Sequence, residues 1–531
     1  MTARYFNTEG LCVPWMHYMV DTTPMIRTII DEYVDRGKYF TINRARQYGK
    51  TTTLSRLEAA LKPDHVVIRL SFEGWDDSAM EDLSLFVDAF VSAVARSLDR
   101  EGLLSAVEET WLSAPRPVTI ERFRVHLENL IRAIDVPTVM MIDEIDKSSQ
   151  SQLVLNFLGM LRTMYLDRED YGSVAFQSVI LAGVTDVKRL KSGMRPDGEH
   201  RLNSPWNIAA TFDVDMSFHP DRIATMLEAY EADHATGMDV AAVAERIYHY
   251  TSGYPFLVSA LCQAMDVHGL AWSPAGVDEA EIIVVKRDEV SLFDSLMHHL
   301  EDADFRAVTR AILLDGAVIP FTSSDPAIGL GRMYGVFVQR DGRTAIANIM
   351  FETRLMSYFV SVSATRALVA THVGDADSYV VGGRLDMGRV MSRFSEFMRE
   401  QYRDRDGSFI EREGRLVFLA FLTPIINGAG TCYLEPETRG GQRMDLAVHY
   451  GGEELIVEFK IWHGARRDEQ AQHQLAAYVK ARGYETGWLL SFTDQRRMPR
   501  HDATVKIELE PEGSSSVTIH ETVIAYHDTR S

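Results

Sequence analysis

Short apolar runs alternate with amphipathic helical patterns over the first 220 residues of the chain. One helical pattern occupies residues 82–98, and the apolar runs lie at 39–43, 65–72, 137–146 and 178–184. Short apolar runs separated by helices are typical of parallel strands joined by right-handed crossovers. Because such strands are covered by helices on both faces, the pattern predicts an α/β domain with a mostly parallel, doubly wound sheet over residues 1–220.

The hydrophobic pattern changes after this region. Residues 221–290 carry helical patterns and predict a helical lid. Residues 291–365 continue with helices and then two apolar runs around Asp341-Gly342, a dipeptide that favours a tight hairpin. This order predicts a winged-helix-like module, and the aperiodic residues 366–390 are expected to be a linker.

A second α/β pattern occupies residues 391–531. A helical pattern opens it, and another runs from residue 467 to 482. Strands are expected at 431–437, 443–450, 454–461 and 486–492. The expected fold class is therefore α/β, with a parallel N-terminal sheet and a separate C-terminal α/β domain.

The composition indicates a folded, intracellular protein. With 531 residues, 46% of them hydrophobic and 25% charged, the chain can bury several cores. No window of about 18 apolar residues occurs, and the N-terminus lacks a signal-peptide pattern, so neither a membrane span nor export is expected. The scattered cysteines Cys12, Cys262 and Cys432 exclude a cysteine-based zinc knot and fit a reducing cytoplasm.

The net charge of −21 argues against broad, non-specific coating of nucleic acid, because the molecule as a whole repels polyanions. Most of the acidic excess lies before residue 391. If any part of the chain contacts nucleic acid, the last domain is therefore the better candidate.

A phosphate-binding loop is predicted between the first strand and the helix that follows it. In the pattern G-x-x-x-x-G-K-[ST], backbone N–H groups and the lysine hold phosphates while the hydroxyl binds magnesium. Gly49, Lys50 and Thr51 match, but Arg44 occupies the position of the first glycine. Gly-Lys-Thr alone is a weak signal, and its location between a strand and a helix raises its weight.

Two adjacent carboxylates, Asp143 and Glu144, follow the apolar run 139–142. In nucleotide-hydrolysing folds the first acid of such a pair holds the magnesium hydration shell, and the second orients or deprotonates the attacking water. Both fall at the carboxyl end of a strand, where parallel sheets bind ligands. The alternative is a solvated strand exit before a turn, and the phosphate loop favours the nucleotide site.

The last domain carries a pattern of two carboxylates and a lysine. Glu458 and Lys460 are two apart and share one face of a strand, and Asp445 begins the preceding strand. Converging carboxylates bind Mg²⁺, and a lysine beside them stabilises charge on an attacked phosphate. The pattern predicts phosphodiester cleavage; the alternative is an edge strand with an ordinary Glu/Lys alternation.

Further residues are candidates for the same site. Gln474 and Tyr478 are four apart on the following predicted helix and share a face. Glu413 opens a predicted helix, and its carboxylate could complete the metal shell, although Glu411 competes for that role.

Together these motifs resemble the AAA-like ATPases of bacteria and archaea that carry a C-terminal PD-(D/E)XK nuclease domain. The loop pattern of that family is Arg-x-Arg-x-x-Gly-Lys, which Arg44 and Arg46 match, so the missing first glycine is a family variant. The resemblance spans most of the chain and is carried by residues 5–60, 142–144, 204–209, 253–255, 347–352, 441–445 and 458–460.

For the N-terminal half, the resemblance implies that the loop binds ATP with Mg²⁺, or with Mn²⁺. Phosphate contacts would come from the loop, and the residues matched there are Arg44, Arg46, Gly49, Lys50 and Thr51. Asp143, with Thr51, would hold the metal, and Glu144 would act on water. The pair Gly253 and Pro255 is similar to an element by which signal-transducing ATPases sense nucleotide from the lid.

For the C-terminal domain, the resemblance implies a PD-(D/E)XK nuclease. Asp445 and Glu458 match its metal-binding positions and Lys460 its catalytic lysine. Gln474 and Tyr478 resemble the Gln-x-x-x-Tyr motif of a subset of these nucleases.

The leading hypothesis is a cytoplasmic protein whose ATP-binding half controls a Mg²⁺-dependent nuclease, with DNA favoured over RNA and a role in defence against foreign DNA implied by the resemblance. A second hypothesis is a nucleotide-dependent switch that binds nucleic acid or another partner without cleaving it. A third is a transcriptional regulator acting through the winged helix, although residues 291–365 are not strongly basic. The oligomeric state stays open, and a homo-oligomer is among the options.

Overall fold

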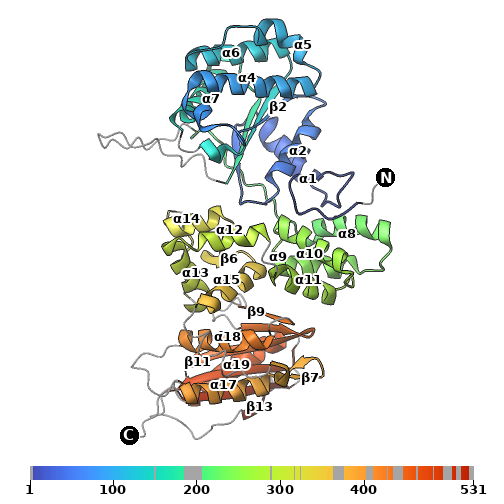
Figure 1. The fold of residues 1–531 in the computed structure, drawn as a ribbon, viewed down its shortest axis with the longest axis vertical. Helices are drawn as coiled ribbons and strands as arrows, with labels where there is room; N and C mark the ends of the chain where they lie inside the picture. The colour runs from blue at the N-terminus through green and yellow to red at the C-terminus, as the bar shows by residue number, and fades with distance from the viewer. Residues whose placement is uncertain are drawn as a thin grey trace, which may run out of the picture. The chain divides into compact units, whose positions relative to one another are not determined.

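The computed structural model forms two compact units (Figure 1). The first comprises Met1–Ala244, Gly253–Gln263 and Arg332–Gly335, and the second comprises Glu245–Ser252, Ala264–Gly331 and Val336–Ser531. No helix in the described part of the chain is long and apolar enough to cross a bilayer. The residues that the structure describes are 4–148, 151–184, 206–286, 290–315, 317–322, 324–362, 376–401, 411–426, 429–434, 446–461, 465–481, 484–493, 505–509 and 516–525.

A four-stranded parallel sheet is the centre of the first unit. Its strands are β1 (Phe40–Asn43), β2 (Val66–Ser71), β3 (Thr138–Asp143) and β4 (Ser178–Gly183), in the order β1-β4-β3-β2. All four strands were expected from the apolar runs, and their existence and parallel pairing are confirmed. An isolated parallel bridge between Phe40 and Ala210 extends the sheet beyond β1.

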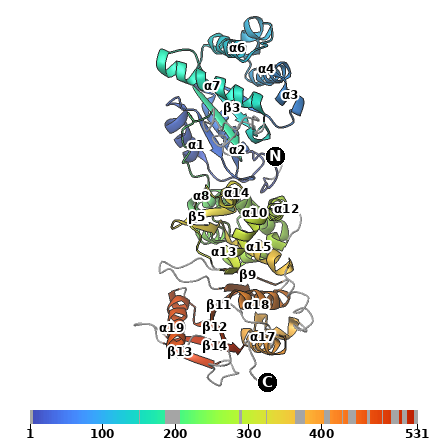
Figure 2. The same cartoon turned by 90° about the vertical axis from the view of Figure 1, so that its left-hand side faces the viewer.

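Helices cover both faces of this sheet (Figure 2). Along β3, Met140 and Ile142 belong to one hydrophobic core, and Val139 and Met141 belong to the other. The first core is closed by α4 (Leu83–Arg100), α6 (Ile120–Ile134) and α7 (Gln152–Tyr171), and the second by α1 (Thr23–Ile29) and α2 (Lys50–Leu61). The alternation of side chains along a strand explains why both sets must be apolar. The shorter elements of this region are η1 (Ile30–Val34), α3 (Asp77–Glu81), α5 (Leu104–Val107), η2 (Glu108–Leu112) and η3 (Ile145–Ser148).

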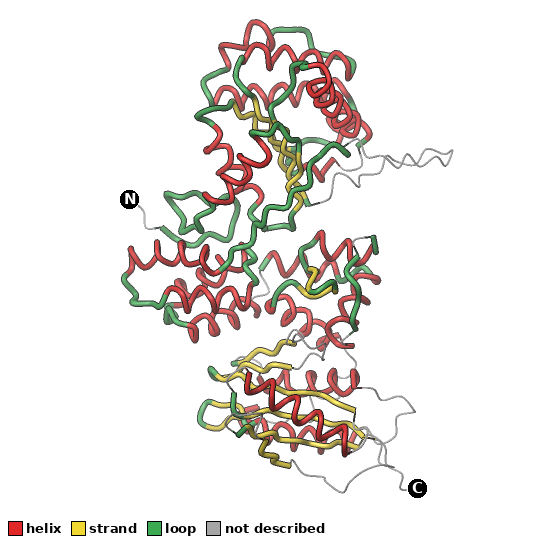
Figure 3. Tube along the Cα trace, turned by 180° about the vertical axis from the view of Figure 1, so that it is seen from behind, coloured by secondary structure: helices red, strands yellow, loops and turns green. Residues whose placement is uncertain are grey.

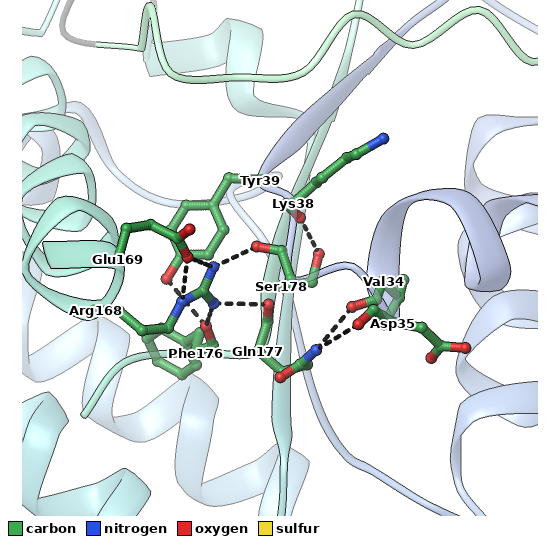
Figure 4. Close-up of polar contacts among 10 residues, drawn as sticks. Val34, Asp35, Lys38, Tyr39, Arg168, Glu169, Phe176, Gln177 and Ser178 are labelled. Atoms are coloured by element: carbon green, nitrogen blue, oxygen red, sulfur yellow. Dashed lines mark hydrogen bonds and ion pairs between the residues drawn. The ribbon is translucent and has the colours of Figure 1, made fainter. Parts of the chain in front are cut away.

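Arg168, near the end of α7, binds the chain at the beginning of strands β1 and β4 (Figure 4). Its guanidinium donates to the carbonyl oxygens of Phe176 (2.7 Å), Gln177 (3.0 Å) and Gly37 (2.5 Å). A β-carbon at residue 37 would lie 2.9 Å from this guanidinium, and its φ of +66° also favours glycine. One planar cation therefore fixes two strand entrances and a helix end at the edge of the sheet where the strands begin.

Helices follow the sheet in both units (Figure 3). They are α8 (Pro220–His234), α9 (Val240–Thr251), α10 (Pro255–His268), α11 (Pro274–Lys286), α12 (Ser291–His299), α13 (Ala303–Asp315), α14 (Pro326–Met333) and, after a hairpin, α15 (Ile349–Val362). The hairpin strands are β5 (Phe337–Arg340) and β6 (Arg343–Ile346). Asp341 and Gly342 between them have φ values of 49° and 79°, as a two-residue turn of the type predicted from this dipeptide requires.

A mixed six-stranded sheet forms the C-terminal part of the second unit. Its order is β13-β14-β12-β11-β10-β9, with parallel pairs β11–β12 and β12–β14 and antiparallel pairs elsewhere. The strands are β9 (Gly430–Leu434), β10 (Leu446–Tyr450), β11 (Glu453–Ile461), β12 (Thr486–Thr493), β13 (Val505–Leu509) and β14 (Val517–Ala525). The helices are α17 (Met387–Gln401), α18 (Glu411–Ile426) and α19 (Ala465–Ala481).

The sequence interpretation omitted β13 and β14, although Val505–Leu509 alternates apolar and polar residues and Val517–Ala525 is rich in β-branched residues, as strands are. Residues 376–385, within the segment expected to be a linker, form η5 (Ala376–Tyr379) and the short hairpin of β7 (Val380–Val381) and β8 (Arg384–Leu385). Arg384 pairs with Glu453 at 2.9 Å. This hairpin therefore packs on the C-terminal sheet, an interaction that local periodicity does not indicate.

Replacing Arg168 with lysine should lower the free energy of unfolding by about 2 kcal/mol, because one ammonium group cannot satisfy three carbonyl groups in one plane. Denaturant unfolding followed by circular dichroism measures the change. Arg132→Lys, at a half-exposed side chain of α6, is the matched control and should change stability by less than about 0.5 kcal/mol. Equal effects of the two substitutions would contradict the role assigned to Arg168.

Candidate functional site

The loop between β1 and α2 leads directly into a helix N-terminus. Gly49 precedes α2 with a φ of 77°, and Gln47 has a φ of 57°. The glycine adopts this left-handed conformation without the strain that a β-carbon would cause. Lys50 and Thr51 occupy the first turn of α2, where free N–H groups and the helix dipole favour an anion.

Lys50 lies back across its own loop. Its side chain donates from Nζ to the carbonyl oxygens of Arg44 (3.0 Å) and Ala45 (2.9 Å), and the residue is only 7% exposed. Burial lowers the pKa of the ammonium group, while the nearby carboxylates, Glu144 first among them, act in the opposite direction. The lysine is therefore held in place by loop carbonyl groups that a bound phosphate can replace.

Thr51 and Asp143 meet at the carboxyl end of β3. The hydroxyl of Thr51 donates to Asp143 Oδ2 at 3.0 Å, and Asp143 Oδ1 accepts from the backbone N–H of Glu144 at 3.0 Å. Asp143 is 4% exposed. A hydroxyl and a carboxylate in contact at this position fit a hydrated Mg²⁺ ion, whose preferred ligands are oxygen atoms. Within the described ranges, no group of three or more His, Cys, Asp or Glu side chains could hold a metal ion.

Glu144 follows Asp143 with a φ of 56°, which is unusual for a residue other than glycine. Burial raises the pKa of its carboxyl, and the charge of Asp143 adds to the increase. The residue borders a pocket of about 400 Å³, whose charged lining consists of Glu58, Glu73, Asp143, Glu144, Arg69 and Arg100. A carboxylate with a raised pKa beside a cavity is suited to accept a proton from water.

Asp146 and Gly183 complete this end of the sheet and were not singled out in the sequence. The Asp146 carboxylate accepts from the backbone N–H of Val184. A β-carbon at residue 183 would lie 2.7 Å from Asp146 Oδ1, so the close approach requires glycine. A glycine that ends a buried apolar run is the sequence signal that could have identified this contact.

The side chain of Arg44, a residue expected to contact the nucleotide, contacts other parts of the protein. Its guanidinium donates to the carbonyl oxygens of Asn43 (2.9 Å) and Val214 (2.8 Å) and lies 5.5 Å from the centre of the Phe212 ring. The residue in the place of the first loop glycine thus anchors the loop to the segment that follows the sheet. Arg46 is exposed.

Tyr254 contacts the same loop from the start of α10. Its hydroxyl donates to the carbonyl oxygen of Arg46 at 2.6 Å, and its ring meets the Tyr48 ring edge to face, 4.8 Å between centres. Gly253 has a φ of 73°, and a β-carbon there would lie 2.5 Å from the carbonyl oxygen of Phe218. The Gly-Tyr-Pro sequence therefore positions a buried tyrosine on the phosphate loop, a contact that the sequence did not reveal.

In the C-terminal sheet, Glu458 and Lys460 share a face of β11, as their spacing predicts. Lys460 Nζ lies 2.5 Å from Glu458 Oε1, and Glu458 is 7% exposed. Asp445, expected to complete the site, lies outside the described residues. Glu413 lies in α18, which begins at Glu411, and its side chain is likewise outside the description.

A third carboxylate lies on the same face of the sheet. Glu458 and Glu521 are both paired with Leu489 of β12, so their side chains point to the same side. Glu521 is 5% exposed and accepts from Ser491 Oγ (3.1 Å) and from Gln472 Nε2 of α19 (2.7 Å). The sequence interpretation missed this network because β14 was not expected.

The two candidate residues on α19 differ in exposure. Gln474 is exposed, and Tyr478 is half-buried. The sheet-facing side of the helix is formed by Ala471, Leu475, Ala476 and Val479, and the glutamine that reaches the sheet is Gln472.

Comparison with protein families shows a match of residues 15–272 to the AAA-like domain family. This part of the chain therefore matches an AAA-like domain, and ATP is the ligand that the match implies. The matched region ends before the second sheet begins. A comparison with curated proteins finds no match.

Solved structures similar to this chain include proteins of Pyrococcus abyssi and Aeropyrum pernix. A Walker-type ATPase of Pyrococcus abyssi is 14% identical, with a TM-score of 0.45 over 66% of this chain and 99% of its own. The ORC2 protein of Aeropyrum pernix is 14% identical, with a TM-score of 0.36 over 64% and 94%. The ORC1 protein of the same organism, solved in complex with DNA, is 15% identical, with a TM-score of 0.27 over 65% and 94%.

Replacing Tyr254 with phenylalanine should weaken ATP binding about three- to tenfold, because one hydrogen bond that fixes the loop contributes about 1 kcal/mol. Isothermal titration calorimetry with ATP and Mg²⁺ measures the affinity. Tyr171→Phe, the same substitution at a residue that is 80% exposed, should leave it unchanged. An unchanged affinity in Tyr254→Phe would show that the hydrogen bond does not organise the loop.

Proposed function

We propose that the N-terminal domain binds ATP with Mg²⁺ at the loop between β1 and α2 and hydrolyses it. The observation that carries the proposal is the contact of Thr51 with Asp143, with Glu144 next to it on the rim of a pocket. Phosphate-binding, metal-binding and water-activating groups thus meet at one edge of a parallel sheet. The match of this region to an AAA-like domain supports the same function.

Each residue has a separate role in this proposal. The N-terminus of α2 and Lys50 bind the phosphates, for which Lys50 exchanges the carbonyl oxygens of Arg44 and Ala45. Thr51 and Asp143 would hold Mg²⁺, which would neutralise phosphate charge. Glu144 orients the attacking water and accepts its proton.

The loop is built without the usual first glycine. Gln47 and Gly49 supply its left-handed turns, and Arg44 fixes its beginning to the carbonyl oxygen of Val214. Because the loop carbonyl groups also hold Lys50, binding of phosphate requires a local rearrangement. We therefore expect slow turnover rather than loss of binding.

Substituting Glu144 with glutamine should lower the ATPase rate about 10²- to 10⁴-fold while ATP still binds, because the amide cannot accept the proton. A phosphate-release assay and calorimetry together separate the two effects. In the wild-type protein the acid limb of the pH–rate profile should lie above the ordinary glutamate pKa of 4.5, since the base must be ionised and its pKa is raised.

Two further variants test this assignment. Lys50→Ala should lose binding as well as turnover, and Glu121→Gln, at an exposed position of α6, should change neither. Full turnover in Glu144→Gln would exclude Glu144 as the base.

We further propose that the C-terminal sheet cleaves phosphodiester bonds in nucleic acid, with DNA favoured over RNA, when Mg²⁺ or Mn²⁺ is present. Support comes from Glu458 and Lys460, which are in contact on one largely buried strand face. In this proposal Asp445, which immediately precedes β10 in the sequence, is the second metal ligand. Glu413 of α18 completes the metal's ligand shell. Gln474 and Tyr478 are auxiliary groups on α19.

In this second site, Glu458 would bind the metal and Lys460 would act on the phosphate. Metal binding to Glu458 would release Lys460 from the ion pair, and the freed ammonium group would stabilise charge on the attacked phosphate. Control of cleavage by ATP would connect the two halves of the chain. The competing function is a nucleotide-dependent switch that binds without cleaving, which the net charge of −21 and the existing ion pair favour.

Glu458→Gln and Lys460→Ala should each reduce Mg²⁺-dependent cleavage at least about 100-fold, because each removes a group that the transition state requires. Labelled single-stranded, duplex and branched DNA, and RNA, are incubated with Mg²⁺ or Mn²⁺, with and without ATP. Lys506→Ala is the matched control, because Lys506 also pairs with a glutamate two residues away but is exposed.

The outcome separates the two functions. Cleavage that persists in Lys460→Ala would contradict this site, as would the absence of cleavage of every substrate by the wild-type protein under conditions in which it binds ATP. In the latter case the switch is the function that remains.

A further inference from the structure

A buried polar cluster lies in the second unit, where side chains of α9, α11, β9 and β10 meet. It belongs to neither proposed catalytic site. Asp278 and Glu281 come from α11, one helical turn apart, and His449 comes from β10. His449 is paired with Thr431 of β9, so both face the helix from adjacent strands. All four residues are less than 9% exposed.

Asp278 is fully engaged. Its Oδ1 accepts from Arg246 Nε at 2.5 Å and from the hydroxyl of Tyr250 at 2.9 Å. Its Oδ2 lies 3.3 Å from His449 Nε2. These contacts keep the pKa of Asp278 low against the opposing effect of burial. A charged carboxylate thus joins α9 and α11 to strand β10.

Glu281 has the opposite environment. It is 0% exposed, and among the described residues neither carboxylate oxygen has a hydrogen-bond partner. The hydroxyl of Thr431 lies beside it and lowers the pKa of Glu281, whereas burial, the largest effect, and the negative charge of Asp278 raise it. An isolated carboxylate in such a place is strongly disfavoured, whereas the neutral acid is tolerated. Burial accordingly raises the pKa of Glu281 to about 8.

Other charged or titratable groups face this cluster from every neighbouring element. Lys286 on α11 and Arg246 on α9 moderate the charge of Glu281, but neither forms a hydrogen bond with it. The remaining groups are Tyr250 of α9, Cys432 of β9, His449 of β10 and Glu454 of β11, and Arg354 of α15 donates to the Val285 carbonyl oxygen of α11.

We propose that this cluster is a proton-dependent latch, in which α11 holds β9 and β10 while Glu281 is protonated and releases them when Glu281 ionises. The contacts of Asp278 position α11 beside β10, and the protonation state of Glu281 determines whether α11 stays there. Because the folded protein binds the Glu281 proton more tightly than the unfolded chain, the latch is fully stable below the ordinary pKa of 4.5. It weakens as pH rises toward about 8.

Opening of the latch would also affect the proposed nuclease site. His449 is on β10 (Leu446–Tyr450), the strand that Asp445 immediately precedes in the sequence. Opening the latch would therefore disturb the strand that presents the candidate metal ligand. This consequence depends on the proposed function, whereas the latch depends only on the contacts of Glu281, Asp278 and His449.

Hydrogen–deuterium exchange tests the latch in the full-length protein without reference to catalysis. The amides of 430–434 and 446–450 are followed between about pH 6 and 9, with β3 of the other sheet as the reference for the intrinsic pH dependence of exchange. In the wild type, protection of these strands relative to β3 should fall about tenfold or more across this range. In Glu281→Gln, which keeps the shape and the neutrality of the acid, it should stay constant.

A parallel pH dependence in the wild type and Glu281→Gln would overturn the proposal. If the variant fails to fold, the infrared spectrum of the wild type provides the test, because a protonated carboxyl band must be present near pH 6 and disappear as protection falls. Its absence at the lower pH would also overturn the latch. Phosphate release should be the same in both proteins, so loss of nuclease activity alone tests the proposed function and not the latch.

Discussion

Removing a charged group from water is the constraint on which most of this structure depends, because an unpaired buried charge destabilises a fold by several kcal/mol. Three largely buried charged side chains of the first unit meet this constraint through backbone groups. Arg168 binds three carbonyl groups, Lys50 binds two, and Asp146 accepts a backbone N–H. Each charged group therefore fixes a segment of main chain. These contacts determine the geometry of the proposed nucleotide site.

Paired charged groups have different roles at the two edges of the parallel sheet. At the edge where the strands begin, Arg168 joins the entrances of two strands through their carbonyl groups, and the result is purely structural. At the opposite edge, Asp143 and Lys50 are held by groups that a ligand can replace, namely a hydroxyl and two loop carbonyl groups. The same physical demand thus gives stability at one edge and a binding site at the other, depending on whether the partner can be exchanged.

The sequence predicted those features that depend on local periodicity. The four apolar strands, the loop ending in Gly49-Lys50-Thr51 and the paired spacing of Glu458 and Lys460 are all local, and the structure contains them. Contacts between distant segments escaped prediction. No local pattern indicated that the Arg44 guanidinium reaches the carbonyl oxygen of Val214, 170 residues away in sequence. Glu521 and Gln472 were missed for the same reason, since their contact depends on a strand order that no single segment encodes.

The turn after α9 has a strongly constrained backbone and lies between two tyrosines that form hydrogen bonds. Tyr250 contributes its hydroxyl to the Asp278 cluster, and Tyr254, four residues later, contributes its hydroxyl to the phosphate loop. Between them Ser252 and Gly253 both have left-handed backbone conformations, and a β-carbon at Gly253 would collide with Phe218. A turn so constrained has few alternative conformations. A displacement of the loop carbonyl group bound by Tyr254 must therefore break that hydrogen bond, because the tyrosine cannot readily follow it.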